Sequence, residues 1–496
     1  MGNYIAVDLG ASNGRTILGR FDGRRLTLKE LNRFETHYTR INDAYHWNLV
    51  GIYKNILGGL LAYAKKTSRP LLGIGIDTWG CDFGLIDKQG KLIGNPRAYR
   101  DPRSLRGMKA FHAKYGEKTA FDHTGIANLE FNTLYQLYDM AQTNDPQLQC
   151  ADKLLLMPDL LGYLLTGEMS NEYTFATTTQ MLDKDTGAWS KEMLGMLCIP
   201  ESLLAPIKRS GTLKGKLLDF VKEDTGFTNT PQIYNVGGHD TASAVASVPA
   251  KGDSFAFISS GTWSLIGILS DKAIISDEVF IRRFSNEGTV DGTYRPLRNI
   301  MGLWIIQNCR RQWDREEKLS WKELNALVDK APGFRSFINV NAHQFFDADN
   351  MTQKIQAFCE ATGQPVPQTK GEIARTVYES LALSYREAFE VLEQLKGGKI
   401  DVLHIVGGGS KNILLNQITA DAINRPVVAG PDEATAIGNL MVQVKAAGEV
   451  SNSDEMRQVI RDSFDVEVYE PKDTQLWDDQ YGRFKDIRQQ YIKNQQ

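Results

Sequence analysis

The sequence predicts an α/β protein built from two domains of related plan. Its 496 residues are too many for one ordinary core. One local design recurs, in which a short β-rich run stops at glycine and small polar residues, at 4–21, 71–87, 254–269 and 401–412. Because the first and third runs each open a segment of roughly 200 residues, we expect one domain over 1–247 and a second over 248–496.

The individual elements follow from the spacing of apolar residues. Each of the first three β-rich runs has two apolar stretches around a glycine-containing loop, which predicts a β-hairpin. The fourth run predicts a strand, a glycine turn and a helix. Apolar residues at intervals of three and four predict helices over 132–142 and 373–395. A packing face is predicted on a C-terminal helix by the aromatic residues Trp477, Tyr481, Phe484 and Tyr491.

Composition and charge exclude several classes of protein. The net charge of −3 argues against binding to nucleic acid or to an anionic membrane. The five cysteines are scattered and form no CxxC, which favours reduced thiols in the cytoplasm over disulfides or a zinc site. The first residues do not have the pattern of a signal peptide. Lys54 interrupts the most apolar window, 49–64, so we expect no membrane span.

A turn rich in hydrogen-bond donors follows the first predicted strand, in DLGASNGR at 8–15. Its backbone N–H groups, with the side chains of Ser12 and Asn13, form a nest of the kind that binds phosphate oxygens. Arg15 adds a charge with fork geometry for phosphate, and Asp8 could hold Mg²⁺ through water. The alternative is an ordinary hairpin turn, because Asn-Gly is a common loop dipeptide.

A second donor-rich turn lies in SSGTWS, around Thr262. One such turn is weak evidence, but two turns, each opening a domain, could hold a triphosphate from both sides. Neither turn is a Walker A loop, because GxxxxGK[ST] is missing there. The GxGxxG spacing of dinucleotide-binding domains is also missing, which argues against a nicotinamide dehydrogenase.

A third glycine cluster, VGGGSKN at 406–412, could contact a nucleotide. Gly407 and Gly408 permit a flat ring or a phosphate to approach the backbone closely. A tight turn between strand and helix is the alternative. The small residues of 430–442 support the nucleotide interpretation, because they predict a helix with a bare start that could form one wall of an adenine slot.

Two stretches carry side chains that suit a sugar. In IDTWGCDFG, Trp79 next to Gly80 is a typical platform for a sugar ring, although a core tryptophan is equally compatible. In NIMGLWIIQN, Asn299 and Gln307 are predicted on one helical face, from which their amides could reach a ribose, a phosphate or a sugar.

The stretch VGGHDTASAV places a carboxylate, Asp240, between a Gly-Gly turn and a run of small residues. Gly237 and Gly238 would let a substrate approach this carboxylate closely. Asp240 is therefore the candidate general base, which would take the proton from a reacting hydroxyl group. His239 and Thr241 could orient the substrate or Asp240 itself, although a structural role for the histidine is the alternative.

These stretches, in this order, resemble the FGGY family of carbohydrate kinases, within the actin, Hsp70 and hexokinase superfamily. The resemblance runs from Asp8 to about Asn439. It implies two actin/ribonuclease-H-like domains with an ATP and sugar cleft between them, and transfer of phosphate from ATP with Mg²⁺. Within the family the details are similar to enzymes that phosphorylate L-rhamnulose at the 1-hydroxyl; L-fuculose, L-xylulose and D-xylulose are the alternative sugars.

The resemblance also implies roles for individual residues, with Asp240 as the catalytic base and Asp8 near the metal through water. The residues implied at ATP are Ala11, Ser12, Asn13, Gly14, Arg15, Thr262, Gln307, Gly407 and Gly408. The residues implied at the sugar are Trp79, Gly80, His239, Asp240, Thr241 and Asn299. We expect a cytoplasmic monomer or small homo-oligomer whose partners are a ketose and ATP. A nucleotide-driven assembly protein of the actin or Hsp70 type is the alternative from another class.

Overall fold

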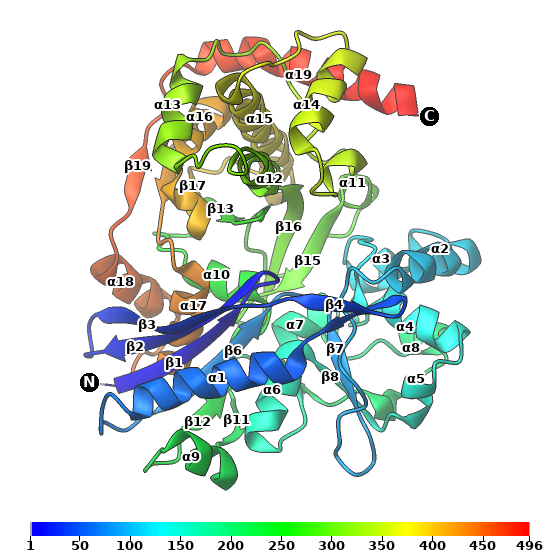
Figure 1. The fold of residues 1–496 in the computed structure, drawn as a ribbon, viewed down its shortest axis with the longest axis vertical. Coiled ribbons are helices and arrows are strands. Elements are labelled where there is room, and N and C mark those ends of the chain that lie inside the picture. Colours follow the sequence, from blue (N-terminus) through cyan, green and yellow to red (C-terminus); the bar gives the residue numbers. More distant parts are fainter. Residues whose placement is uncertain (1, 496) are drawn as a thin grey trace. The chain divides into compact units, whose positions relative to one another are not determined.

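The computed structural model describes residues 2–495, with side chains described up to residue 491. The chain divides into two compact units (Figure 1). Unit 1 consists of Met1–Pro249, Leu269–Pro296 and Glu433–Phe464, and unit 2 consists of Ala250–Ile268, Leu297–Asp432 and Asp465–Gln496. Unit 1 thus includes segments that follow position 247, and the predicted domain boundary at 247/248 stays a prediction.

A mixed sheet forms the centre of unit 1, with the strand order β11-β12-β6-β1-β2-β3. Its strands are β1 (Gly2–Leu9), β2 (Asn13–Phe21), β3 (Leu26–Glu35), β6 (Gly73–Thr78), β11 (Leu213–Lys216) and β12 (Gln232–Tyr234). The antiparallel pair β1–β2 confirms the first predicted hairpin. Strand β6 runs parallel to β1, and this register places Asp8 beside Asp77.

Helices cover both faces of this sheet (Figure 1). Ile5 and Val7 of β1 pack in the core that contains α1 (Leu49–Ala64), while Tyr4 and Ala6 pack in the core that contains α17 (Ala434–Ala446). Successive side chains of a strand point to opposite faces. Strand β1 is apolar at each of these positions because both of its faces are buried.

The hairpin predicted over 71–87 is wrong. Strand β6 pairs with β1 and β12, so both of its edges are occupied. The second apolar run forms β7 (Phe83–Ile86), which pairs with β8 (Lys153–Leu156) in a separate small sheet. Between β6 and β7 the chain turns at Cys81, whose φ of 72° is unusual for a residue other than glycine.

Unit 1 contains further elements around this framework. They are β4 (Tyr38–Ile41), β5 (Ala44–Trp47), α2 (Arg103–Tyr115), α3 (Thr119–Thr124), α4 (Thr133–Gln142), α5 (Pro146–Cys150), α6 (Met157–Thr166), β9 (Asn171–Glu172), α7 (Tyr173–Thr177), α8 (Lys191–Leu197), β10 (Ile207–Lys208), α9 (Asp219–Thr225), α10 (Asp240–Ala246), α11 (Asp277–Ile281), β15 (Phe284–Gly288) and α18 (Ser453–Ser463). Helix α4 confirms the helix predicted over 132–142.

The larger sheet has the order β15-β16-β14-β13-β17-β18-β19, of which the strands from β14 to β19 belong to unit 2. They are β13 (Phe255–Ser260), β14 (Trp263–Gly267), β17 (Val402–Val406), β18 (Val427–Ala429) and β19 (Glu467–Tyr469), while β16 (Tyr294–Met301) is divided between the units after Pro296. Strands β13 and β14 confirm the predicted hairpin, and β17 runs parallel to β13. Unit 2 therefore repeats the hairpin-plus-parallel-strand plan of unit 1.

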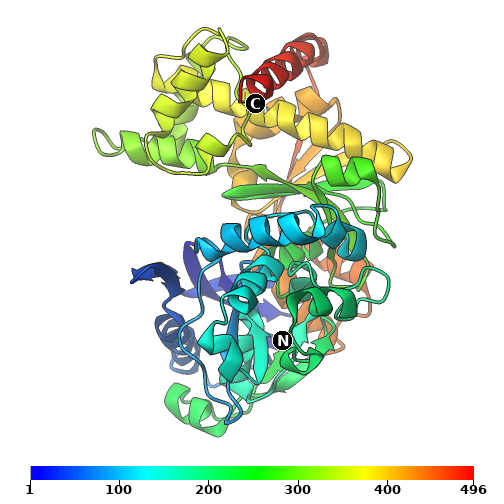
Figure 2. The same cartoon turned by 90° about the vertical axis from the view of Figure 1, so that its right-hand side faces the viewer.

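The helices of unit 2 are α12 (Trp304–Trp313), α13 (Trp321–Lys330), α14 (Met351–Ala361), α15 (Lys370–Lys396), α16 (Ile413–Ile423) and α19 (Thr474–Gln495). The strand, glycine turn and helix predicted for the fourth β-rich run are confirmed by β17 and α16, and the helix over 373–395 by α15. Helix α19 lies beside α15 and α16 (Figure 2). Its Trp477 packs on Phe334 and its Phe484 on Phe337, which confirms the packing face. Within the described chain, helices long and apolar enough for a membrane span are not found.

Candidate active site

Asp240 is the first residue of α10, and a Gly-Gly turn leads into it. The amide of Thr78, at the end of β6, donates a hydrogen bond of 2.9 Å to the carbonyl of Gly238, so the turn is fastened to the sheet. A Cβ on Gly237 would come within 2.7 Å of the amide nitrogen of Ser243. Both glycines therefore serve close packing within the protein, since a Cβ on Gly238 would lie 3.0 Å from the carboxylate of Glu172.

The carboxylate of Asp240 remains accessible, with 32% of its side chain exposed. The hydroxyl of Thr241 donates a hydrogen bond of 3.0 Å to its Oδ1, and Nε2 of His239 lies 3.5 Å from the same oxygen. Desolvation by the surrounding protein raises the pKa of Asp240; the histidine opposes this effect, and the negative charge of Asp8 adds to it. A raised pKa makes the carboxylate a better proton acceptor.

Two more carboxylates belong to the same part of unit 1. Asp8 and Asp77 are register partners on the parallel strands β1 and β6. Asp77 is fully buried; Nδ2 of Asn439 donates a hydrogen bond of 2.6 Å to its Oδ2, while its Oδ1 has no partner among the described residues. Burial raises the pKa of Asp77 well above its ordinary value, and the charges of Asp8 and Asp240 add to this effect.

Sequence reasoning missed Asp77, although a signal was present. IAVDLG at 5–10 and IGIDTW at 74–79 both place an aspartate behind a β-rich apolar run. Two such strands that run parallel bring their ends to one edge of a sheet. The repeat of the pattern could therefore have indicated a pair of carboxylates.

The donor-rich loop connects β1 and β2. The amide of Gly10 donates a hydrogen bond of 2.9 Å to the carbonyl of Asn13, and the hydroxyl of Thr36 donates one of 2.7 Å to the carbonyl of Gly10. Ser12 and Asn13 are exposed at the tip. Gly14 is required, because a Cβ there would come within 2.6 Å of Leu9 and Phe34. The loop is therefore a hairpin turn that also presents exposed hydrogen-bond donors, so the two interpretations of this stretch are compatible.

Arg15, at the end of this loop, is held by two carboxylates. Its Nη2 donates to Asp8 and its Nη1 to Glu433. Burial opposes the charge of the guanidinium, but Asp8 and Glu433 outweigh it and raise the pKa of Arg15. Sequence reasoning did not assign Glu433, which lies at the start of α17 and belongs to unit 1 with its two partners.

Trp79 lies in the core, with only 4% of its surface exposed. Its ring centroid is 4.0 Å from that of Trp47, and its Nε1 donates a hydrogen bond of 2.8 Å to the carboxylate of Asp82. Gly80, by contrast, is partly exposed, and a Cβ there would lie 3.4 Å from Nε2 of His239. Among the residues predicted at the sugar, the structure therefore brings Gly80, His239 and Asp240 together.

The predicted nucleotide residues of unit 2 lie at the ends of neighbouring strands. Thr262 is in the turn between β13 and β14, and its carbonyl accepts a hydrogen bond of 3.1 Å from the amide of Trp304. This contact fastens the first turn of α12, which carries Gln307, to the loop. Gly407 follows β17, the parallel neighbour of β13, and a Cβ on it would lie 3.0 Å from the carbonyl of Ser260.

Each glycine of the cluster after β17 has a different local role. Gly407 has a φ of 87°, which favours glycine, and a Cβ on Gly409 would come within 2.0 Å of Oγ of Ser260. Gly408 is exposed, and a Cβ on it would meet no atom of the described residues within 4 Å. The fold itself therefore requires Gly407 and Gly409, whereas Gly408 has open space around it.

Asn299 and Gln307 do not share a helical face, so that prediction is wrong. Asn299 is in strand β16, opposite Leu265 of β14, and Gln307 is in α12. The apparent helical spacing crosses a junction at Gly302, where a Cβ would come within 2.6 Å of Oγ of Ser264. Oδ1 of Asn299 is buried and has no partner among the described residues.

The adenine wall predicted within 430–442 is also wrong. Ala434 and Ala436 of α17 are buried, at 1% and 0% exposure. A Cβ on Gly438 would come within 1.7 Å of the carbonyl of Ser243. The small residues are there because α17 packs closely on α10 within unit 1.

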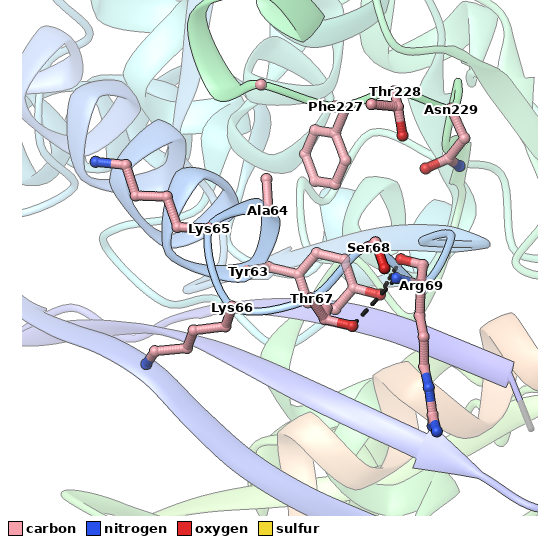
Figure 3. Close-up of a pocket in the computed structure, with 11 residues that line it drawn as sticks. Tyr63, Ala64, Lys65, Lys66, Thr67, Ser68, Arg69, Phe227, Thr228 and Asn229 are labelled. Carbon is pink, nitrogen blue, oxygen red and sulfur yellow. Dashed lines mark hydrogen bonds between the residues drawn. The ribbon is translucent and has the colours of Figure 1, made fainter.

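A cavity of about 390 Å³ lies elsewhere in unit 1, lined by residues 63–69 and 226–229 (Figure 3). None of the predicted site residues lines it. Lys65 and Lys66 point away from the ring of Phe227 in the close-up (Figure 3). Cavity volume alone therefore does not identify the active site.

Comparison with solved structures defines the fold class. The chain matches a ligand-bound xylulose kinase from Lactobacillus acidophilus with a TM-score of 0.81 and 16% identity, over 99% of this chain and 98% of that chain. It matches glycerol kinase from Plasmodium falciparum with ADP at a TM-score of 0.79 and 16% identity, over 100% and 98%. At this identity the likeness shows the fold alone, which is the fold of carbohydrate kinases.

Family models and curated relatives then define the family. The N-terminal domain model of the FGGY family of carbohydrate kinases matches residues 3–247, and the C-terminal domain model matches 256–447. The chain is 43% identical to the rhamnulokinase of Bacteroides thetaiotaomicron over 97% of this chain and 99% of that protein. It is 37% identical to the rhamnulokinase of Bacillus subtilis, over 95% and 96%. The chain belongs to the FGGY family of carbohydrate kinases, so it is a carbohydrate kinase that uses ATP.

Proposed function

We propose that the protein transfers the γ-phosphoryl group of ATP to the 1-hydroxyl of L-rhamnulose, which gives L-rhamnulose 1-phosphate and ADP. The observation that carries the proposal is the accessible carboxylate of Asp240, which lies with His239 and Gly80 in unit 1. The choice of sugar is supported by curated relatives that are named rhamnulokinase and are 36–43% identical over nearly the whole chain.

Asp240 acts as the general base. As the hydroxyl oxygen of the sugar forms its bond to the γ-phosphorus, the bond from that phosphorus to the leaving ADP oxygen breaks. The proton of the hydroxyl passes to the carboxylate of Asp240. Its raised pKa supports this role. Thr241 restrains Oδ1 of the carboxylate, and His239 and Gly80 contact the sugar.

Each unit carries residues that we propose to contact the nucleotide. In unit 1, the loop from Ala11 to Gly14 binds phosphate oxygens, which its exposed Ser12 and Asn13 support. Arg15 stabilises the loop through Asp8 and Glu433 and adds positive charge for phosphate. In unit 2, the nucleotide residues are Thr262, Gln307, Gly407 and Gly408.

A divalent cation, Mg²⁺, fits the carboxylates Asp8 and Asp77. The negative charges of the two carboxylates repel each other, and Oδ1 of Asp77 has no partner among the described residues. In the described part of the chain, no cluster of three or more His, Cys, Asp or Glu could enclose a metal ion. Mg²⁺ keeps several waters and takes one or two carboxylates besides substrate phosphates. Bound there, the cation would neutralise phosphate charge.

The remaining assignments are extensions of this proposal. The buried, unpartnered Oδ1 of Asn299 supports a contact with substrate. Trp79 supports the sugar site chiefly by fixing the chain before Gly80, since its ring is in the core. Free cysteines, Cys81, Cys150, Cys198, Cys309 and Cys359, support a cytoplasmic location.

An assay of ADP release with a panel of ketoses tests the proposal. The panel contains L-rhamnulose, L-fuculose, L-xylulose, D-xylulose and L-ribulose at equal concentrations with saturating ATP and Mg²⁺. We expect kcat/KM for L-rhamnulose to exceed that for every other sugar by at least about tenfold, a difference of roughly 1.4 kcal/mol in transition-state binding. A higher kcat/KM for another ketose would reassign the substrate.

A further inference from the structure

A buried ion pair lies next to His239. Glu287 is in β15 and Arg295 is in the part of β16 that belongs to unit 1. Nη2 of Arg295 donates a hydrogen bond of 2.5 Å to Oε2 of Glu287. The side chain of Arg295 is 0% exposed and that of Glu287 is 7% exposed. Both side chains are therefore buried within unit 1.

Both members of the pair meet one nitrogen of the histidine ring. Nδ1 of His239 lies 3.0 Å from Oε2 of Glu287 and 2.9 Å from Nη2 of Arg295. The other ring nitrogen, Nε2, lies 3.5 Å from Oδ1 of Asp240 and 3.4 Å from where a Cβ on Gly80 would stand. The ring thus links a buried ion pair on one side to the candidate sugar site on the other.

The pair is built at an energetic cost. Nε and Nη1 of Arg295 are buried without a hydrogen-bond partner among the described residues. Burial opposes the charge of Glu287, but Arg295 and His239 outweigh this and hold the pKa of Glu287 below its ordinary value. A buried ion pair with unsatisfied donors contributes little to stability, and apolar residues of similar volume often do as well. A role other than stability would account for its presence.

We propose that Glu287 and Arg295 are positioning residues, which hold the ring of His239 so that Nε2 faces Asp240 and Gly80. Because the pair engages Nδ1, it leaves Nε2 as the nitrogen that meets a hydroxyl of the sugar. This inference rests on the proposed function and extends it, since it explains how a buried pair contributes to sugar recognition without touching the sugar.

The test compares two double variants of the full chain. The first, E287M/R295M, removes both charges together, so that no buried charge is left unpaired. The matched control, R375M/E379M, removes a second Arg–Glu pair, in α15 of unit 2, in which Glu379 is buried and Arg375 is partly exposed; Nε of Arg375 donates a hydrogen bond of 2.7 Å to Glu379. The single variant E287Q, which keeps a hydrogen-bond acceptor beside Nδ1, serves as a conservative check.

The first readout does not require activity. The chain has seven histidines, so selective ¹⁵N labelling of their rings gives few signals, and the variant His239→Gln identifies those of His239. We expect E287M/R295M to move both ring nitrogen signals of His239, E287Q to move them less, and the control to leave them in place. Unchanged His239 signals in E287M/R295M would overturn the proposal.

The second readout is steady-state kinetics. We expect kcat/KM for the sugar to fall on the order of 10-fold to 100-fold in E287M/R295M, as for a displaced substrate contact, while KM for ATP stays within about twofold. Equal losses for sugar and ATP, or an equal loss in the control, would show a merely structural role and overturn the proposal. If the panel names another ketose, the same kinetics are run with that sugar, and the ring signals still decide the positioning role.

Discussion

Asp240 carries the chemical step in the proposed reaction, and the variant Asp240→Asn tests it. Because an amide cannot accept the proton, we expect kcat to fall on the order of 10²- to 10⁴-fold, the usual contribution of a positioned base. The dissociation constant for ATP, measured by calorimetry, should change little. A matched control is Asp219→Asn, since Asp219 also begins a seven-residue helix, α9, but is exposed. Near-normal turnover in Asp240→Asn would refute the assignment.

The raised pKa of Asp240 predicts the acid side of the pH profile. Below this pKa the carboxyl is protonated and cannot accept a proton, so kcat/KM for the sugar should fall with decreasing pH. Because desolvation by the surrounding protein, with the added charge of Asp8, raises the pKa, the fall should be centred above about 3.9, the ordinary value for aspartate. Initial rates across pH 4 to 8, with constant ionic strength, measure it. A rate that stays flat down to pH 4 would contradict the prediction.

At the scale of the element, the packing of α17 on α10 should position the base. Gly438→Ala would force a Cβ to within 1.7 Å of the carbonyl of Ser243, which belongs to the same short helix as Asp240. We expect a loss of roughly 1–3 kcal/mol in the free energy of unfolding and a lower kcat. Denaturant melts and ADP release measure both.

The control for this variant is a second helical glycine. A Cβ on Gly482, in α19, would meet no atom of the described residues within 4 Å. Gly482→Ala should therefore raise stability by up to about 1 kcal/mol, because alanine is the better helix former. If both substitutions have the same effect, close packing of α17 on α10 does not matter.

The loop after β17 gives a separate prediction, for the nucleotide. Gly408→Val fills open space without a clash inside the protein, so the melting temperature should stay within a few degrees. If the space is occupied by ATP, KM for ATP should rise about tenfold or more while KM for the sugar changes little. Gly398→Val, at a second open glycine, controls for the added side chain. An unchanged KM for ATP would remove Gly408 from the nucleotide site.

At the scale of the whole molecule, the buried carboxylate of Asp82 should influence stability through pH. It accepts hydrogen bonds of 2.6 and 2.8 Å from the indoles of Trp47 and Trp79, yet burial outweighs them and raises its pKa to about 6. The folded protein thus binds this proton more tightly than the unfolded chain. The stability it contributes is complete below pH 4 and is lost as the pH rises to about 6.

The variant Asp82→Asn isolates this effect, since its amide does not titrate. The stability of the natural chain relative to the variant should fall by up to about 3 kcal/mol between pH 4 and pH 6, the value of two pKa units. Denaturant melts at several pH values measure the difference. A difference that does not vary with pH would mean that Asp82 keeps an ordinary pKa.

Much of the fold could be predicted from local patterns. The hairpins β1–β2 and β13–β14, the strand–turn–helix of β17 and α16, and helix α15 all follow from the spacing of apolar residues and glycine. The prediction over 71–87 failed because hairpin pairing and parallel pairing use the same apolar pattern. Which edge a strand offers is decided by its neighbours, and β6 is paired on both edges.

The site shows the same division between local and distant information. Asp240, His239 and Gly80 could be selected as chemistry-bearing residues beside small neighbours. Glu287, Arg295 and Glu433 could not, because their sequences look like ordinary polar positions and only the fold brings them to His239 and Arg15. The small residues of α17 suggested a ligand wall, yet they serve helix packing.

The sequence by itself predicted the reaction class, through glycine-rich turns, hydrogen-bond donors and a carboxylate beside small residues whose order resembles that of the FGGY family, because the types of residue that carry such chemistry are local. Only the tertiary structure decided which charges act on one another. Pairing of β1 with β6 placed Asp8 beside Asp77, and β15 and β16 brought a buried ion pair to His239. Electrostatic interactions act through space over a few ångströms, so they depend on distances that separation along the chain does not encode.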